Sequence, residues 1–154
     1  MGAQCIVVWG NNASNSSPIG LYAQLVRARK RGAKLIVIDP RRTKEAEMAD
    51  LWLQIRPGTD IALMLGWIRL IIEEDLYDHD FVADWTVGFE ELKEAAASYT
   101  PGSVSQITRI PAKLVVKSAR MYATGKPAVI PFGYGLDKQR ISPLRAVRFW
   151  HPFR

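Results

Sequence analysis

Cysteine and histidine are scarce in this 154-residue sequence, which contains one cysteine and two histidines. A single thiol cannot close an internal disulfide, so the chain is not a disulfide scaffold. Zinc and iron–sulfur sites need several such ligands, and neither His79 nor His151 has ligand partners at a suitable spacing. Cys5 lies within an apolar run, where a buried small residue is expected. The sequence therefore predicts no metal ligand and no catalytic residue among these side chains.

No apolar run is long enough to cross a bilayer. The longest, residues 61–72, is interrupted by Arg69 and falls short of the roughly 20 residues that a membrane span needs. We expect a buried helix there and no insertion into a membrane. The first residues also lack the basic segment, apolar run and cleavage site of a signal peptide, so nothing in them directs export. The cellular compartment is left open.

What is present is 48% hydrophobic residues and a net charge of +6. This apolar content and length fit one domain with a buried core and exclude a disordered chain. The charge is segregated, because residues 27–44 hold eight bases and one acid, whereas residues 45–101 hold thirteen acids and three bases. No aromatic residue interleaves with the bases of 27–44, so the pattern does not favour nucleic acid as a partner.

Two short apolar runs, residues 5–9 and 34–39, are typical of buried strands. Between them, residues 18–31 show a helical apolar period that starts at a proline and ends before Gly32. A strand, a helix and a strand within about 35 residues form a βαβ unit with parallel strands. We expect further strands at 51–55 and 128–132, and helices at 45–50, 60–74, 104–110, 111–124 and, as a pair, within 78–98. The predicted fold class is α/β: a Rossmann-like, mainly parallel sheet flanked by helices.

Polar segments follow three of these strands, at the sheet edge where ligands bind in this class of fold. The first, GNNASNSS at 10–17, places a glycine and several amide and hydroxyl donors before a helix, which suits a phosphate. It lacks the further glycines of a dinucleotide fingerprint and the Gly-Lys-Ser/Thr of a P-loop. An ordinary polar loop, in which Ser16 or Ser17 caps the helix, explains the segment about equally well.

The second and third polar segments, DPRRT at 39–43 and RPGTD at 56–60, offer carboxylates. An acid such as Asp39 at the tip of a second strand accepts ribose hydroxyls in nucleotide-binding folds, and neighbouring arginines pair with phosphate or stack on a base. The Asp60 carboxylate can accept two N–H groups from the edge of guanine, and Gly58 lets the backbone approach. Plain turn and helix capping explains each segment taken singly. Together the three segments predict a site for a guanine nucleotide or a similar diphosphate.

The segments GNNASNSSP at 10–18 and KLIVIDPRRTKEAEMADLWLQIRPGTDIAL at 34–63 resemble the molybdopterin oxidoreductase family, also called the dimethyl sulfoxide reductase family. The resemblance extends through 77–92 and 104–122 to the Gly-x-Gly of 133–135. The stretch DLYDHDFVADWTVGFEELKE is most similar to a branch with acetylene hydratase-like and anaerobic reductase-like members.

The resemblance implies that this domain binds one of two molybdopterin guanine dinucleotides that together hold a molybdenum or tungsten ion. Motif matching places the expected contacts in order along that cofactor. They are Gly10, Asn12 and Asn15 at the pyrophosphate or adjoining pterin end, Asp39 and Arg41 at the guanosine, Gly58, Thr59 and Asp60 at the guanine, and, by a looser match, Gly133, Gly135 and Gln139 near the pterin.

Parts that the family's chemistry needs are not visible in this sequence: a cysteine cluster for an iron–sulfur cofactor, a residue that ligates the metal, and a domain that completes the second dinucleotide site. We therefore expect residues 1–139 to be the cofactor-binding α/β domain of a larger oxidoreductase, inactive by itself. Its partners would be the remaining domains and an electron-transfer subunit. The tail at 140–154 departs from the family pattern, and we expect it to be truncated or altered.

Two alternatives to a cofactor domain stay open at this point. One is a stand-alone nucleotide- or phosphate-binding Rossmann-like module without redox activity, which would use the same three segments. The other is an anion-binding interaction domain that works through the bases of 27–44.

Overall fold

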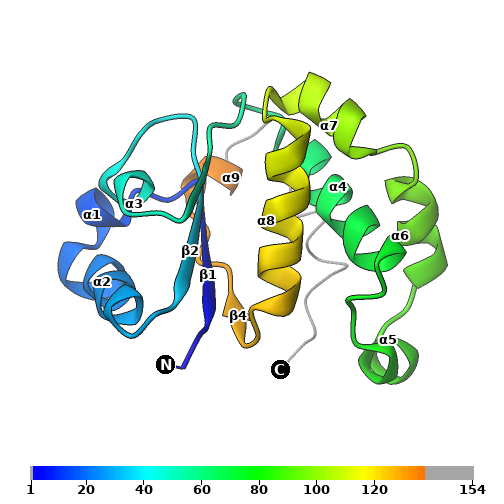
Figure 1. Cartoon of the computed structure of the whole chain (residues 1–154), viewed down its shortest axis with the longest axis horizontal. Coiled ribbons are helices and arrows are strands. Elements are labelled where there is room, and N and C mark those ends of the chain that lie inside the picture. The colour runs from blue at the N-terminus through cyan, green and yellow to red at the C-terminus, as the bar shows by residue number, and fades with distance from the viewer. Residues whose placement is uncertain (1, 138–154) are drawn as a thin grey trace.

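The computed structural model describes residues 2–137, and Figure 1 shows their arrangement. Two sequence predictions, the site residue Gln139 and the atypical tail at 140–154, lie outside the described residues. The proposed boundary after residue 139 therefore stays a prediction.

A parallel sheet with the strand order β3, β2, β1, β4 forms the centre of the described structure. Its strands are β1 (Cys5–Trp9), β2 (Lys34–Ile38), β3 (Leu51–Leu53) and β4 (Ala128–Val129). Strands β1 and β2 pair along their whole length, from Cys5 opposite Lys34 to Trp9 opposite Ile38. Because β1 also pairs in parallel with β4, and β2 with β3, the predicted α/β class and parallel βαβ unit are confirmed.

Helices cover both faces of the sheet (Figure 1). One face carries α1 (Ala13–Ser16), the π-helical turn η1 (Pro18–Tyr22), α2 (Ala23–Lys30) and α3 (Lys44–Glu47). On the other side lie α4 (Asp60–Glu73), α5 (His79–Trp85), α6 (Phe89–Ala96), α7 (Pro101–Thr108) and α8 (Ala112–Thr124). A last short helix, α9 (Tyr134–Asp137), follows β4. None of the helices within residues 2–137 has the length and apolar character needed to cross a membrane.

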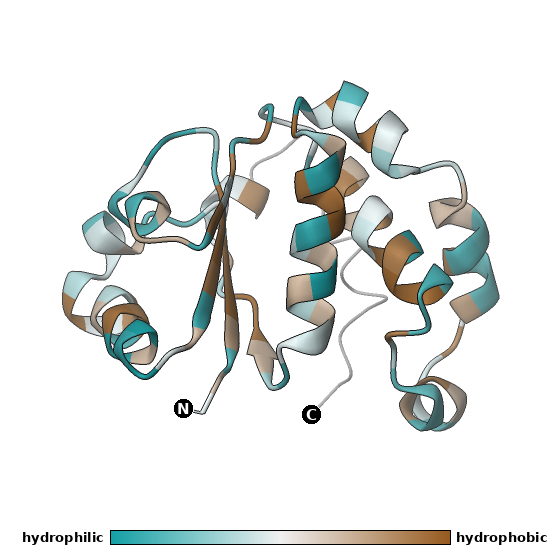
Figure 2. Ribbon diagram, in the orientation of Figure 1, coloured by the Kyte–Doolittle hydropathy of each residue, from teal (hydrophilic) through white to brown (hydrophobic). Residues whose placement is uncertain are grey.

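The two covered faces explain why β1 and β2 are continuous apolar runs, because successive side chains of a strand point into opposite layers. Val7 and Ile36 join the core beneath α4 and α8, whereas Val8 and Val37 join the core beneath α2. Figure 2 shows the resulting brown strands between helices whose outer faces are teal or pale.

Several predicted elements differ from the structure. The strand expected over 51–55 ends at Leu53, and the helix expected over 45–50 is the single turn α3. The helix expected over 18–31 is split, because the chain makes the π-helical turn η1, closed by a hydrogen bond from the Leu21 N–H to Ser17 Oγ, before α2 begins. Helix α7 starts earlier than expected, because Thr100 caps it by accepting the Ser103 N–H. The strand expected over 128–132 is reduced to β4 and an isolated bridge between Trp9 and Phe132.

The thiol of Cys5 is predicted to be unreactive in the folded chain. It is fully buried in β1, and burial, with a smaller effect from the charge of Asp50, raises its pKa to about 11 from an ordinary value of 9.0. Ellman's reagent at a pH of about 8 should label Cys5 only after denaturant is added. The folded state keeps this proton to a higher pH than the unfolded state, so its contribution to stability falls as the pH rises from 9.0 to about 11. Rapid labelling of the native chain would contradict this burial.

Candidate functional site

A pocket of about 320 Å³ lies where β1, β2 and β3 end. Its lining comes from the segment after β1, the end of β2 with the turn that follows, the segment between β3 and α4, and α9. The lining residues are Gly10, Ile38, Asp39, Pro40, Arg41, Ile55, Pro57, Gly58, Asp60 and Gly135. In Figure 1, α9 lies beside the sheet at the end where β1 and β2 finish.

Six of the residues predicted from the sequence line this pocket: Gly10, Asp39, Arg41, Gly58, Asp60 and Gly135. Four others are described but do not line it, namely Asn12, Asn15, Thr59 and Gly133. Four further lining residues were not predicted from the sequence: Ile38, Pro40, Ile55 and Pro57. These apolar residues flank the predicted polar ones, and their position at strand ends was the signal that could have included them.

Asp39 is buried and forms a closed turn with the residue two positions on. Its side chain is 6% exposed, and its Oδ1 accepts the Arg41 backbone N–H at 2.8 Å. The Arg41 side chain is 72% exposed, and its Nε lies 3.8 Å from the same oxygen. The turn capping that the sequence allowed is therefore present, and it fixes a carboxylate and a guanidinium at the pocket wall.

Asp60 is the first residue of α4 and is 4% exposed. Its Oδ1 accepts the indole N–H of Trp9 at 2.7 Å. A negative charge at this position is favoured by the dipole of the 14-residue helix that follows it. Thr59 does not cap that helix with its side chain. Its hydroxyl donates to the Arg56 carbonyl oxygen at 2.6 Å. Gly58 adopts a φ of 82°, a left-handed conformation that glycine takes without strain.

Gly133 and Gly135 bring α9 against the end of β1. A Cβ atom on Gly133 would lie 2.5 Å from the Gly10 carbonyl oxygen, and one on Gly135 would lie 3.0 Å from it. The Gly133 N–H also donates to the Trp9 carbonyl oxygen at 3.1 Å. Close packing of α9 against the backbone of Gly10 is therefore one reason for glycine at positions 133 and 135. This packing alone is enough to bring Gly135 to the pocket wall.

In the segment 10–17, Gly10 is the residue that lines the pocket. The Ser14 N–H near the start of α1 donates to the Glu45 carboxylate at 2.5 Å, and Asn12 Oδ1 accepts the Ser14 hydroxyl at 2.9 Å. Asn15 is exposed. The Ser14 amide, one of the donors that the sequence offered to a phosphate, is thus already bonded within the protein.

Glu45 was not among the residues that the sequence predicted for the site. Its side chain is fully buried in α3, and its Oε2 has no hydrogen-bond partner among residues 2–137. Burying a carboxylate costs free energy, which its bond to Ser14 offsets only in part. The bond joins the segment after β1 to the one after β2, so Glu45 helps to hold two walls of the pocket together.

The basic patch of 27–44 is partly used within the fold. Arg29 Nη1 lies 2.5 Å from Asp50 Oδ2 and donates to the Ala33 carbonyl oxygen at 2.9 Å. Asp50 Oδ2 also accepts the Leu35 N–H at 2.8 Å. Arg29 therefore ties α2 to the sheet, and the patch offers fewer bases to an anion than the sequence suggests.

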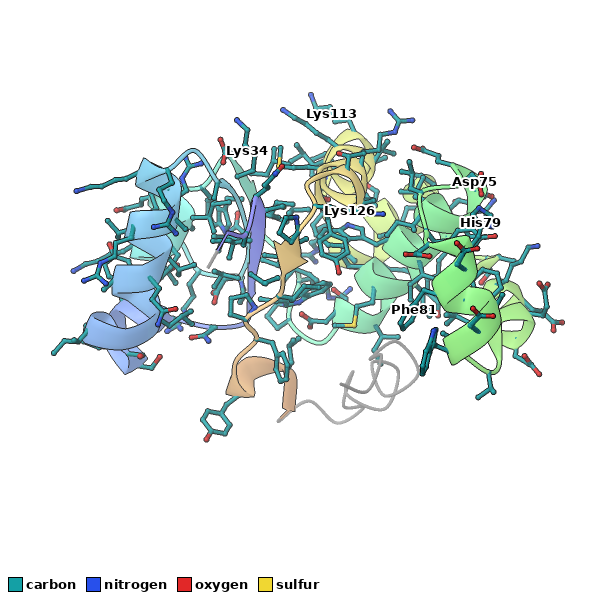
Figure 3. The ribbon with its side chains drawn as sticks, turned by 90° about the horizontal axis from the view of Figure 1, so that it is seen from below. Lys34, Asp75, His79, Phe81, Lys113 and Lys126 are labelled. Atoms are coloured by element: carbon teal, nitrogen blue, oxygen red, sulfur yellow. The ribbon has the colours of Figure 1, made fainter. Side chains whose placement is uncertain are left out.

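Nothing within residues 2–137 resembles a metal centre, because no group of three or more His, Cys, Asp or Glu side chains converges there. His79 is exposed and pairs with Asp75 at 2.7 Å, on the helical side of the molecule (Figure 3).

The family model for molybdopterin oxidoreductase matches residues 2–140. The chain belongs to the molybdopterin oxidoreductase family. Acetylene hydratase from Syntrophotalea acetylenica is 50% identical over 140 residues, which are 91% of this chain and 19% of that protein. Formate dehydrogenase H from Escherichia coli is 42% identical over 133 residues, 86% of this chain and 18% of that protein.

A solved structure of a family member shares the fold. Acetylene hydratase from Pelobacter acetylenicus superposes with a TM-score of 0.88 at 50% sequence identity, covering 92% of this chain and 19% of that one. The resemblance inferred from the sequence is thereby confirmed, including its acetylene hydratase-like branch. The chain spans about a fifth of the length of these relatives.

Proposed function

We propose that this chain is the domain of a molybdopterin oxidoreductase that binds the guanosine and pyrophosphate part of one molybdopterin guanine dinucleotide. The observation that carries the proposal is the pocket that joins the ends of β1, β2 and β3, with Asp39 and Asp60 in its walls. Ligands of parallel α/β sheets bind at this edge. A stand-alone nucleotide-binding module would use the same pocket, but membership of the family favours the cofactor domain.

The residues of the pocket fit a guanosine. Pro40 and Pro57 line the pocket and are exposed, so they supply apolar surface against which a planar base can pack. The Asp39 carboxylate would accept ribose hydroxyls, and the Arg41 guanidinium beside it would pair with phosphate or stack on the base. In this role the chain's own residues bind and orient the cofactor, and the bound cofactor supplies the metal-centred chemistry.

The pyrophosphate would pass close to Gly10, which lines the pocket wall. The absence of a side chain at Gly10 leaves room for α9, because a Cβ there would lie 3.5 Å from Leu136 Cγ. Asn12, Asn15 and Thr59 do not line the pocket, and we propose that they support its walls or reach the cofactor beyond the guanosine. Gly133 and Gln139 keep their loose assignment near the pterin. The parent enzyme would add an iron–sulfur cluster, the metal ligand, either molybdenum or tungsten, and contacts with an electron-transfer subunit.

The proposal predicts that the chain prefers GDP to ADP and that Asp60→Asn reduces this preference. An asparagine presents an N–H₂ group where guanine needs an acceptor, so GDP affinity should fall by about tenfold while ADP affinity changes little. Isothermal titration calorimetry of the 154-residue chain measures both affinities. Asp75→Asn, which changes an exposed carboxylate in a turn away from the sheet, is the matched control and should leave both unchanged. Equal binding of GDP and ADP by the unmodified chain would contradict the proposed function.

A further inference from the structure

We propose that Trp9 is a positioning residue for base selectivity, and that it acts by holding the plane of the Asp60 carboxylate through its indole N–H. The inference rests on the proposed function, since it concerns how the same pocket distinguishes guanine from adenine. Trp9 does not line the pocket, so it would act through Asp60 and not by touching the base.

The geometry of the pair makes Trp9 a rigid donor. Its Nε1 lies 2.7 Å from Asp60 Oδ1, and the residue is 2% exposed. The backbone of Trp9 is held on both sides, because its N–H donates to Pro131 at 3.2 Å and its carbonyl accepts from Gly133 at 3.1 Å. The ring also packs against Trp67, with centroids 5.6 Å apart and planes inclined by 60°.

A fixed plane matters for recognition of guanine. The terminal torsion of an aspartate is broad, so a carboxylate without a fixed donor can rotate away from the orientation that accepts two parallel N–H groups. Each carboxylate oxygen has two lone pairs, so Oδ1 can accept the Trp9 indole and a base N–H together. The hydrogen bond to Trp9 therefore orients Asp60 while it uses one lone pair of Oδ1.

The structure supplies a matched control in Trp67. This tryptophan is also buried, at 4% exposure, and its indole N–H also donates to a buried side chain, Ser118 Oγ, at 3.1 Å. Its ring packs against the rings of both Trp9 and Tyr122, with centroids 5.6 Å and 5.5 Å away, respectively. Trp67 has no hydrogen bond to Asp60 and does not line the pocket.

The test compares Trp9→Phe and Trp67→Phe by calorimetric titration of the 154-residue chain with GDP and with ADP. Both variants keep an aromatic ring and lose one indole N–H. We expect Trp9→Phe to lower the ratio of GDP to ADP affinity by about fivefold or more. Trp67→Phe changes only the packing against the Trp9 ring and leaves the Trp9 indole N–H in place, so it should lower this ratio by less than about twofold. A loss of packing alone would weaken both nucleotides together. An unchanged ratio in Trp9→Phe would overturn the inference.

A double-mutant cycle tests whether Trp9 acts through Asp60. In an Asp60→Asn background, Trp9→Phe should cause no further loss of the GDP to ADP ratio. Additive losses would overturn the positioning role. If the unmodified chain shows no preference for GDP, the proposed function fails and the inference falls with it. If the preference exists but Trp9→Phe retains it, only the inference fails.

A measurement on the chain with both tryptophans intact keeps the inference testable if Trp9→Phe does not fold. The Trp9 indole N–H resonance in a ¹H–¹⁵N spectrum reports on its bond to Asp60. Saturating GDP should shift the Trp9 resonance, and ADP at the same occupancy should shift it much less. The Trp67 indole resonance should shift little with either nucleotide. Equal shifts of the Trp9 resonance with GDP and ADP would overturn the inference.

Discussion

Replacing Ile36 with alanine is expected to lower the free energy of unfolding by about 2–5 kcal/mol. Ile36 lies at the middle of β2, between β1 and β3, and is fully buried. Its side chain belongs to the core that also contains Leu63 and Val115 from α4 and α8. Removing most of it leaves a cavity between the sheet and these helices, which the packed surroundings fill only in part.

The same substitution at Ile19 is the matched control. This isoleucine lies in η1 and is 92% exposed, so Ile19→Ala should change the free energy of unfolding by less than about 0.5 kcal/mol. Urea unfolding followed by circular dichroism measures both values. Equal effects at the two positions would contradict the two-layer core. Because Asp39 directly follows β2, Ile36→Ala should also weaken GDP binding more than Ile19→Ala does.

The sheet was predictable because its strands are covered on both faces. Residues 5–9 and 34–38 are apolar at almost every position, and such runs bounded by turn residues match only a buried strand of this length. The division of 18–31 into η1 and α2 was not predictable in the same way. Both arrangements place Leu21 and Leu25 toward the sheet, so the apolar period does not distinguish between them.

The location of the pocket was predictable from topology, because parallel strands bring the segments that follow them to one edge. The hydrogen-bonded pairs that hold the walls of the pocket together were not predictable in this way. Trp9 and Asp60 are 51 residues apart and Ser14 and Glu45 are 31 apart, and no local pattern of residue types encodes such a contact. The sequence indicated that Asp60 either caps a helix or accepts hydrogen bonds from a nucleotide base. Its hydrogen bond to the Trp9 indole is visible only in the structure.

The packing of Gly133 against Gly10 leads to the second large effect. Gly133→Ala is expected to lower the free energy of unfolding by about 1–3 kcal/mol, because overpacking forces the surrounding backbone to move. The new Cβ would lie 2.5 Å from the Gly10 carbonyl oxygen and 3.0 Å from the Asn11 Cα. Both are backbone atoms, so no flexible side chain can rotate away to relieve the contact. Urea unfolding measures the loss.

Gly102→Ala is the control for Gly133→Ala. Gly102 lies in α7, and a Cβ there meets only the Thr100 hydroxyl at 3.8 Å, an ordinary contact. Alanine favours a helix over glycine, so this variant should leave the free energy of unfolding unchanged or raise it by up to about 1 kcal/mol. GDP titration of the two variants then separates packing from binding. Gly10 and Gly135 line the pocket, so their displacement in Gly133→Ala should also lower the affinity for GDP. If Gly133→Ala kept both its free energy of unfolding and its GDP affinity, the predicted clash between α9 and the end of β1 would be wrong.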